Sequence, residues 1–550
     1  MKLHTRFTLF LLPVLSFQIC LGQFSQKDII IRADSLLKTY EHANAPGMGF
    51  AILREGKVIY KKTFGLANLE NNSPITDSTA FNIASVSKQF TAFMALLAER
   101  DGKLSLDDDI RTYLPELKQL GHKITIRQLA NHTNGLPNIS EIKKLQGFGD
   151  EFKITNSEAV HTLLQIKHLN FLPGTQYQYN NTGFTLLAEI LRSVYKKDFN
   201  TLLTEYIAGP LQMKNTVSIA DPDKIVPNKA ESYYQKGNVF FKLPIGQMVS
   251  GSSNIYTTLN DLCVWAANFY HPVVGSSALY DEMKKNTVLR SGKQIEYGLG
   301  LQTENYKGTD IVFHGGGTVG YRSYILHVPS QQLSVIMLGN KQGFEGLLIA
   351  YQLVDFFLQN QHKFDKRPQQ ISHTPAALQQ LAGIYQINPG NYLDISAEGK
   401  NLYIGTYGNK GKEQLQVMGA HKFKITSIPT ASLTFHRESV DLRIADFTYN
   451  AKRTKLNAPK IAVAALHKFV GFYRNEEFNT IYQLLIDNDK LVARHPLNGD
   501  IQLKPLLKNS FYSTTEYFGQ LDFKFDKHHN ATGFNLSGAN MLNIQFKKLK

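Results

Sequence analysis

The last third of the 550-residue chain contains an internal repeat, which limits how this region can fold. Four sequence markers recur at one offset of 88 or 89 residues: Leu381–Tyr385 matches Phe469–Tyr473, Leu402 matches Leu491, Phe423 matches Phe511, and Leu433–Phe435 matches Leu521–Phe523. Strand-like alternation dominates each copy, and long helical patterns are absent. The repeat therefore predicts two small antiparallel barrels of about 80–90 residues each, with six to eight short strands, because closure removes exposed strand edges.

The region before the repeat has a different pattern. Gly47–Leu53 and Lys57–Phe64 alternate around a Glu-Gly turn and predict a hairpin, whereas Ser87–Arg100 carries apolar residues at helical spacing. Such a mixture predicts an α+β domain, with an antiparallel sheet flanked by helices. We expect five segments: a signal peptide (1–22), the α+β domain (23–365), a polar, proline-containing linker (366–377), the first barrel (378–458) and the second barrel (459–550).

The first residues have the pattern of a secretory signal. Lys2 and Arg6 precede an apolar stretch from Phe7 to Leu21, and small residues stand ahead of Gln23. A retained signal anchor is the alternative, and a lipid anchor on a cysteine is disfavoured by the residues before it. We expect an exported protein, periplasmic or secreted. After signal cleavage no stretch of about 18 consecutive apolar residues remains, so no transmembrane segment is expected.

Charge and cysteine content exclude some classes of function. The formal net charge is +15, but the basic residues are dispersed and form no run of the kind that binds nucleic acid. Cys263 remains alone once the signal is removed, and its apolar helical surroundings predict a buried small hydrophobe. The histidines are scattered without zinc-ligand spacing, so we expect no metal site and no cofactor. The pattern leaves the oligomeric state open.

Ser85-Val-Ser-Lys88 precedes the helical stretch and contains residue types suited to nucleophilic catalysis. Residues three apart share one helical face, so Lys88 can approach the Ser85 hydroxyl. A desolvated amine with a lowered pKa can accept the serine proton, and the helix N-terminus favours developing negative charge. Alone the pattern also fits a capping serine followed by a surface lysine.

Two later segments add to this interpretation. Tyr179-Asn-Asn181 follows a Pro-Gly turn and precedes a helical pattern, so it offers a phenol as proton carrier and an amide to orient a substrate. His314 is followed by three glycines, Gly315–Gly317, which allow the backbone to approach a ligand closely. A packed tyrosine and an incidental histidine are the structural alternatives.

In order and separation these motifs resemble the serine β-lactamase and penicillin-binding family, specifically its branch of class C β-lactamases, D-alanyl-D-alanine carboxypeptidases, D-aminopeptidases and esterases. Ile124–Leu136 and Gly251–Thr258 resemble further family segments. The resemblance covers about residues 30 to 360 and implies a β-lactamase/transpeptidase-like fold without a cofactor. It also implies that Ser85 is the acylated nucleophile, that Lys88 activates it, and that Tyr179 shuttles protons.

The same resemblance assigns Asn181 to the substrate's amide side chain and places Gly316 and Gly317 at the substrate, with the N–H groups of Ser85 and Gly317 as an oxyanion hole. His314 stands where many relatives have lysine, and we expect a weaker, pH-dependent cation there. This form resembles the D-aminopeptidase and esterase members. Some relatives use appended barrels to shape the active-site entrance, and a purely structural or ligand-binding role stays open.

We therefore expect a serine hydrolase that acts through an acyl-enzyme on small-molecule or peptide substrates: amides, peptides containing D-amino acids, or esters. One alternative is a penicillin-binding carboxypeptidase or β-lactamase that uses the same residues on cell-wall peptides or β-lactams. An alternative of another class is a binding or sensor protein whose catalytic site has been retired.

Overall fold

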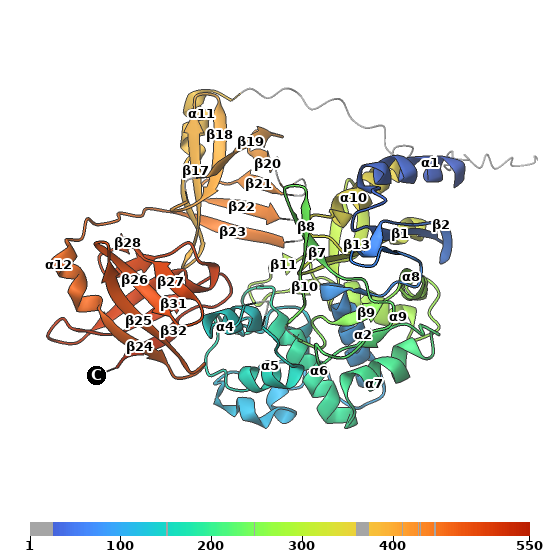
Figure 1. Cartoon of the computed structure of the whole chain (residues 1–550), viewed down its shortest axis with the longest axis horizontal. Coiled ribbons are helices and arrows are strands. Elements are labelled where there is room, and N and C mark those ends of the chain that lie inside the picture. Colours follow the sequence, from blue (N-terminus) through green and yellow to red (C-terminus); the bar gives the residue numbers. More distant parts are fainter. Residues whose placement is uncertain are drawn as a thin grey trace, which may run out of the picture.

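A computed structural model describes residues 26–149, 152–246, 248–358, 373–409, 411–426, 428, 431–444 and 447–549. The expected signal segment 1–22 and residues 366–372 of the expected linker lie outside these ranges. The chain forms an α+β domain and two β-rich domains that lie beside it (Figure 1). We call the β-rich domains the first barrel, β16 to β23, and the second barrel, β24 to β32.

A six-stranded antiparallel sheet is the centre of the α+β domain. Its strands follow the order β12 (Gln302–Tyr306), β13 (Thr309–Thr318), β14 (Tyr321–Val328), β15 (Leu333–Gly339), β1 (Met48–Arg54) and β2 (Lys57–Phe64). The pairing of β1 with β15 joins the beginning of the domain to its end, with Met48 opposite Gly339. The sheet is therefore complete only when two strands about 300 residues apart in the sequence pair with each other.

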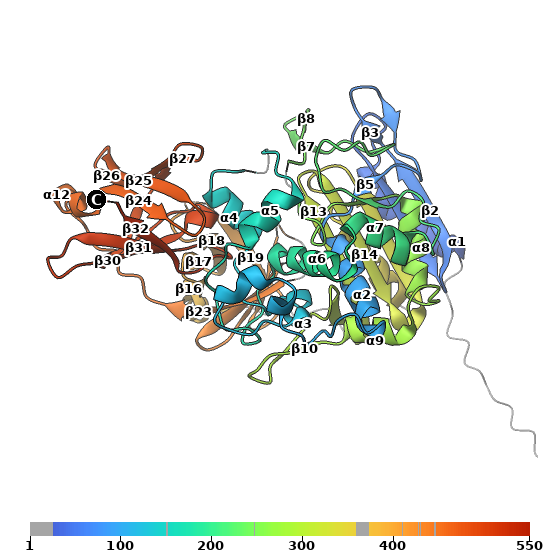
Figure 2. The ribbon, with the colours of Figure 1, turned by 90° about the horizontal axis from the view of Figure 1, so that it is seen from below.

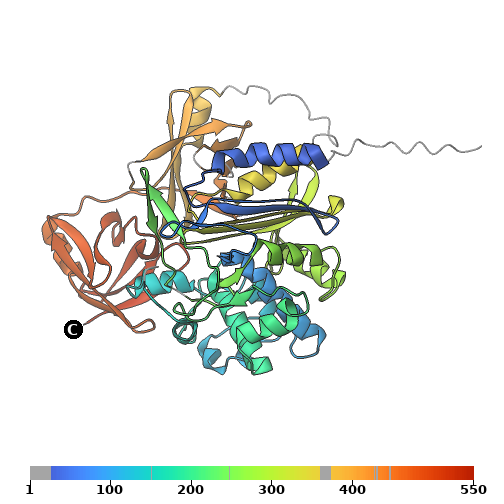
Figure 3. The same cartoon turned by 45° about the vertical axis from the view of Figure 1, so that its right-hand side comes forward.

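Helices cover both faces of this sheet, as Figure 3 shows. One face packs on α1 (Gln26–Leu37) and α10 (Gly346–Leu358) around a core that includes Phe50 and Leu353. The other face packs on a helical layer whose main members are α2 (Ser87–Arg100), α3 (Ile126–Ala130), α4 (Ile139–Leu145), α5 (Asn156–Leu163), α6 (Asn181–Tyr195), α7 (Phe199–Leu203), α8 (Leu259–Asn268) and α9 (Ser277–Lys284).

The predicted fold class is confirmed. The hairpin expected around Glu55-Gly56 is β1–β2, whose two turn residues have φ of 52° and 73°, and the helix expected at Ser87–Arg100 is α2 with the same bounds. Burial of Cys263 at 5% exposure matches its interpretation as a small hydrophobe, and burial raises the pKa of its thiol to about 12. The spacing of apolar residues was a sufficient guide here, although β1 and α2 are buried on nearly every side.

The repeated region forms one closed barrel and one nearly closed barrel. The first has eight strands: β16 (Gly383–Asn388), β17 (Asn391–Glu398), β18 (Asn401–Thr406), β19 (Lys412–Val417), β20 (Lys422–Ile425), β21 (Ser432–Phe435), β22 (Ser439–Ile444) and β23 (Phe447–Thr454). The second is a nine-stranded sheet of β24 (Gly471–Asn475), β25 (Thr480–Asp487), β26 (Lys490–His495), β27 (Gly499–Gln502), β28 (Lys504–Leu507), β29 (Ser510–Tyr512), β30 (Gln520–Phe525), β31 (Ala531–Ser537) and β32 (Ile544–Lys548).

Both copies of the repeat contain the same hydrogen bond. The Tyr385 hydroxyl donates to the Leu381 carbonyl at 2.8 Å, and the Tyr473 hydroxyl donates to the Phe469 carbonyl at 2.8 Å. In the first copy the helix α11 (Pro375–Leu381) precedes the first strand, and in the second copy the helical turn His467–Phe469 does so. The tyrosine therefore fixes the angle between that turn and the strand.

The second barrel packs directly on the helical layer, and Figure 2 shows α4 and α5 on the side that faces it. One continuous hydrophobic core joins the two domains, whereas the first barrel has a core of its own. The Tyr482 hydroxyl donates to the Leu145 carbonyl at the end of α4 at 3.0 Å, and Asn138 N–H donates to the Asn540 carbonyl at 3.2 Å. The second barrel thus supports the segment that precedes α4.

The first barrel meets the α+β domain at the outer strand of the sheet, where Arg443 and Glu304 form an ion pair at 2.5 Å. It also contacts the second barrel, because the Tyr392 hydroxyl donates to Gln520. Within the residues that the structure describes, none of the helices is both long and apolar enough to cross a bilayer.

Tyr473→Phe should destabilise the second barrel by about 1–2 kcal/mol, because the Phe469 carbonyl loses its buried donor. Urea unfolding of the full chain would measure the change. Tyr403→Phe is the matched control, since no hydrogen bond of the Tyr403 hydroxyl is found within the described residues. Equal stability losses in the two variants would contradict a role for the Tyr473 bond.

Candidate active site

Ser85 lies on a tight turn between a strand and a helix. β5 (Phe81–Asn82) leads into the short turn Ala84–Val86, and α2 begins at Ser87. Ala84 has φ of 45°, a left-handed conformation that is unfavourable for a residue with a Cβ atom. The Asn82 side chain accepts the Ala84 N–H at 2.8 Å and donates to Asn254 Oδ1 at 3.0 Å. These bonds hold the turn that presents Ser85 at the start of α2.

Lys88 is completely buried one helical turn after Ser85. Its Nζ atom lies 3.0 Å from Ser85 Oγ, 2.9 Å from Asn181 Oδ1 and 2.9 Å from the Ser252 carbonyl oxygen. No carboxylate pairs with Lys88 among the described residues. The sequence-based expectation that the lysine approaches the serine hydroxyl is therefore met in the geometry.

The surroundings of Lys88 favour a neutral amine. Burial holds the pKa of Lys88 well below its ordinary value, because the charged form loses its hydration. A neutral amine has two N–H groups and one lone pair. Asn181 Oδ1 and the Ser252 carbonyl oxygen can only accept hydrogen bonds, so each accepts one of the two N–H groups. The lone pair is then left for the hydroxyl hydrogen of Ser85, which is the arrangement that a general base requires.

Tyr179 and Asn181 both lie close to the Lys88 amine. The Lys88 Nζ atom lies 4.9 Å from the Tyr179 ring centroid, and that ring is 6.2 Å from the ring of His314. Asn181 is the first residue of α6, and its N–H donates to Asn138 Oδ1 at 3.0 Å. The amide that was predicted to contact substrate is thus also a partner of the lysine.

The glycine segment brings β13 against the nucleophile. A Cβ atom on Gly316 would lie 2.2 Å from Ser323 Oγ, 2.4 Å from the Ile83 carbonyl oxygen and 3.1 Å from the Ser85 nitrogen. Only glycine permits this approach. A Cβ atom on Gly317 would meet nothing closer than 3.4 Å, so the two predicted substrate-binding glycines have different constraints.

His314 is buried, and both of its ring nitrogens bond to protein groups. Nδ1 lies 2.6 Å from the Gly315 carbonyl oxygen and Nε2 lies 3.0 Å from the Tyr297 hydroxyl. Burial, together with the nearby amine of Lys88, lowers the pKa of His314 to about 3. Burial therefore favours a neutral imidazole in place of the expected pH-dependent cation, because the charged form would lose its hydration.

His132 and Tyr297 complete this cluster and were not singled out from the sequence as site residues. The Tyr297 hydroxyl lies 3.1 Å from His132 Nε2, and the His132 ring packs on the Tyr179 ring with centroids 4.2 Å apart. The His132 and Tyr297 rings are nearly inaccessible to water, whereas Tyr179 is partly exposed. His132 occurs in the segment Ile124–Leu136, whose family resemblance was the only sequence signal available for it.

The hydrogen bonds in this cluster fix one set of proton positions. Asn180 N–H donates to His132 Nδ1 at 3.3 Å, so His132 carries its proton on Nε2 and donates it to Tyr297. Tyr297 can then donate to His314 Nε2, and His314 donates from Nδ1 to the carbonyl of Gly315. Both imidazoles are neutral in this arrangement, in agreement with the lowered pKa of His132.

The structure thus brings together every residue that the sequence nominated for the site, through contacts that link Ser85, Lys88, Asn181, Tyr179, His314 and Gly316, with Gly317 next on β13. Their catalytic and substrate-binding roles stay predictions. Within the described part of the chain, no three His, Cys, Asp or Glu side chains are arranged to hold a metal ion.

Comparison with protein families and curated proteins gives consistent relatives. A family model described as Beta-lactamase matches residues 33–355. A D-aminopeptidase of Gluconobacter oxydans is 30% identical over 296 residues, which are 54% of this chain and 56% of that protein. A D-aminopeptidase of Brucella anthropi is 26% identical over 449 residues and is matched over 80% of both chains. The first match spans little more than half of the relative, whereas the second spans four fifths of each chain.

Solved structures share the fold. The octameric penicillin-binding protein homologue from Pyrococcus abyssi aligns with a TM-score of 0.54 and 22% identity, over 78% of this chain and 99% of that one. SurE in its structure with D-Leu aligns with a TM-score of 0.53 and 19% identity over the same shares. Identities this low establish a common fold and leave the chemistry to be argued from the site.

Gly316→Ala should destabilise the α+β domain by about 1–3 kcal/mol and slow the reaction of Ser85 with a fluorophosphonate, because the new methyl group forces β13 away from the turn before α2. Urea unfolding and the labelling rate measure the two effects. Gly317→Ala is the matched control for stability, since its Cβ atom meets only Arg322 at 3.4 Å. A stable Gly316→Ala variant with normal labelling would refute the close approach.

Tyr297→Phe should slow fluorophosphonate labelling of Ser85 about tenfold or more and cost about 1–3 kcal/mol, because it leaves a buried donor on His132 and a buried acceptor on His314 unpaired. The control is Tyr280→Phe, which removes a buried partner of Asn268 outside the site, at 2.7 Å. This control should lose stability but keep its labelling rate. Identical labelling in both variants would reduce the Tyr297 cluster to a packing role.

Proposed function

The chain belongs to the β-lactamase family, and on that premise we propose that it is a serine hydrolase in which Ser85 forms an acyl-enzyme. One observation carries the proposal. The Lys88 amine is buried without a carboxylate partner in the described residues, and its Nζ atom lies 3.0 Å from the Ser85 hydroxyl oxygen. A surface lysine next to a capping serine would be hydrated and protonated, and it could not act as a base at neutral pH.

In the proposed reaction Lys88 accepts the Ser85 proton while Ser85 Oγ forms a bond to the substrate carbonyl carbon. The N–H groups of Ser85 and Gly317 receive the oxyanion. When the tetrahedral intermediate breaks down, the proton passes from Lys88, with Tyr179 as the adjacent carrier, to the departing nitrogen or oxygen. Water then attacks the acyl-enzyme by the same proton route, and Ser85 is regenerated.

For the substrate we propose a small amide, a peptide containing a D-amino acid, or an ester. The D-aminopeptidase relatives support the first two. The neutral His314 supports them as well, since a substrate that ends in a free carboxylate next to the scissile bond, such as a terminal D-alanine, would find no cation at that position. Cell-wall carboxypeptidase or β-lactamase activity is therefore the less favoured use of the same residues.

The cellular location that we propose, periplasmic or secreted, is supported by the signal-like pattern of residues 1–22 alone. The second barrel contributes a carbonyl to Asn138, whose side chain contacts the N–H of Asn181, so its proposed role is to stabilise the entrance of the site.

The proposal is tested by treating the full chain with a fluorophosphonate and with a labelled penicillin, then locating adducts by mass spectrometry. We expect the fluorophosphonate on Ser85 and no adduct in Ser85→Ala. The labelling rate should rise with pH as Lys88 loses its proton, and the midpoint should lie well below 10.5, because burial lowers this pKa. In Lys88→Met the labelling should be slowed by about 10²-fold or more at neutral pH.

Three outcomes would change the assignment. Penicillin labelling of Ser85 would favour the cell-wall reading. Hydrolysis that persists in Ser85→Ala would remove the mechanism. An unreactive Ser85 in a correctly folded protein would favour a retired site with a binding role.

A further inference from the structure

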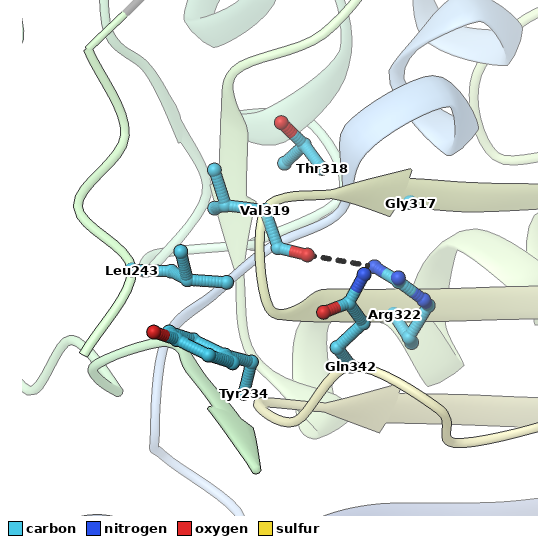
Figure 4. Close-up of a pocket in the computed structure, with 7 residues that line it drawn as sticks. All are labelled: Tyr234, Leu243, Gly317, Thr318, Val319, Arg322 and Gln342. Atoms are coloured by element: carbon cyan, nitrogen blue, oxygen red, sulfur yellow. Dashed lines mark hydrogen bonds between the residues drawn. The ribbon is translucent and has the colours of Figure 1, made fainter. Parts of the chain in front are cut away.

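A pocket of about 620 Å³ opens beside the predicted oxyanion hole. Figure 4 shows the residues that line it: Gly317, Thr318, Val319 and Arg322 from the β13–β14 hairpin, Tyr234 and Leu243 from the segment of the β7–β8 hairpin, and Gln342 after β15. Tyr234 and Leu243 supply an apolar wall. The β7 (Tyr233–Lys236) and β8 (Val239–Lys242) strands hold that wall next to the sheet.

Among the described residues that line this pocket, Arg322 is the one with a charged side chain. It stands directly opposite Gly317 in the β13–β14 pairing, and its Nη1 atom would lie 3.4 Å from a Cβ atom on Gly317. Nη1 donates to the Val319 and Tyr321 carbonyl oxygens at 3.1 Å and 2.7 Å. These two bonds orient the guanidinium without neutralising it.

The charge of Arg322 has no partner within the described part of the chain, where no carboxylate forms an ion pair with it and its Nε and Nη2 groups make no hydrogen bond to protein atoms. Its surroundings lower its pKa through loss of hydration, yet a guanidinium stays charged at neutral pH. A partly buried, unpaired guanidinium with a free fork of donors matches the geometry of a carboxylate.

The position of the pocket relative to Ser85 indicates which half of a substrate would enter it. β12 pairs with β13 only as far as Phe313, and no other described strand pairs with this edge of β13 beyond it, so an extended substrate could pair there. Gly316 faces Ser85, and alternation along the strand turns Gly317 toward Arg322 on the other face. Side chains of a substrate paired to this edge would also alternate between the two faces.

The proton carriers stand at the opposite end of this edge. His314, Tyr179 and Lys88 cluster before Gly316, and the proposed proton transfer to the leaving group takes place there. The leaving group therefore lies toward His314. The acyl half of the substrate extends past Gly317 toward Val319 and the pocket.

We propose that this pocket is a subsite for an acidic side chain on the acyl half of the substrate, with the carboxylate bound by Arg322 and its methylene groups against Tyr234 and Leu243. The inference rests on the proposed hydrolase function and deepens it. It assigns the enzyme a preference for amides, peptides or esters whose acyl residue is aspartate-like or glutamate-like.

The test compares two isosteric substrates, D-glutamic acid α-(4-nitroanilide) and D-glutamine α-(4-nitroanilide), in the full-length protein. We expect kcat/KM to favour the acid by about tenfold or more in the wild type. In Arg322→Gln this ratio should fall to about one. Lys341→Gln is the matched control: it removes a neighbouring positive charge that does not line the pocket, so it should leave both rates and the ratio unchanged.

A second readout does not need turnover. N-acetyl-D-glutamate should slow the fluorophosphonate labelling of Ser85 in the wild type more than N-acetyl-D-glutamine does, and this difference should vanish in Arg322→Gln. If Ser85 reacts and both substrates are cleaved equally, or if Arg322→Gln keeps the preference, this inference fails while the proposed function stands. If Ser85 does not react and neither substrate is cleaved, both proposals fail.

Discussion

The site depends on an amine that is buried without a counter-charge. Lys88 has lost its water, and the described structure supplies three neutral groups in its place: the Ser85 hydroxyl, the Asn181 amide oxygen and the Ser252 carbonyl oxygen. A carboxylate at any of these positions would favour the charged form and remove the base. The arrangement costs stability, because a buried lysine gives up hydration that it keeps in the unfolded chain.

That requirement explains much of the structure around the amine. Asn181 begins α6, and Ser252 lies in the segment before β9 (Ile255–Thr257), so α2 is held between two other parts of the helical layer. The strained Ala84 and the close packing of Gly316 place the sheet against the same turn. The strained backbone and the close packing persist because the tightly packed core around them holds both in place.

Charge is distributed unevenly along the open edge of β13. The end next to Lys88 is neutral, since His132 and His314 are buried imidazoles linked through Tyr297. The other end carries the guanidinium of Arg322, which forms no ion pair with any carboxylate that the structure describes. A positive group close to Lys88 would lower the pKa of its amine further. A positive group beyond Gly317 can instead attract an anionic group of the substrate. The second barrel supports this geometry from outside through Asn138.

The sequence by itself determined the elements and nominated Ser85 and Lys88 as the proposed nucleophile and base. The period of apolar residues placed α2 at Ser87–Arg100, the 88-residue offset placed two β-rich copies, and the spacing of Ser85 and Lys88 put both on one helical face. These features are local, so a one-dimensional pattern contains them. The second copy has nine strands and the first has eight. This difference depends on how each sheet closes, so the sequence pattern did not predict it.

Only the tertiary structure decided which distant residues meet and what charge they carry. His132 and Tyr297 are 165 positions apart, and neither has a spacing that would identify it. The neutrality of His314 follows from burial, which no single residue type encodes. The lack of a described carboxylate beside Arg322 likewise depends on which segments pack around it. Desolvation and long-range pairing are properties of the packed chain, and for that reason the sequence named the reactive residues while the fold fixed their protonation.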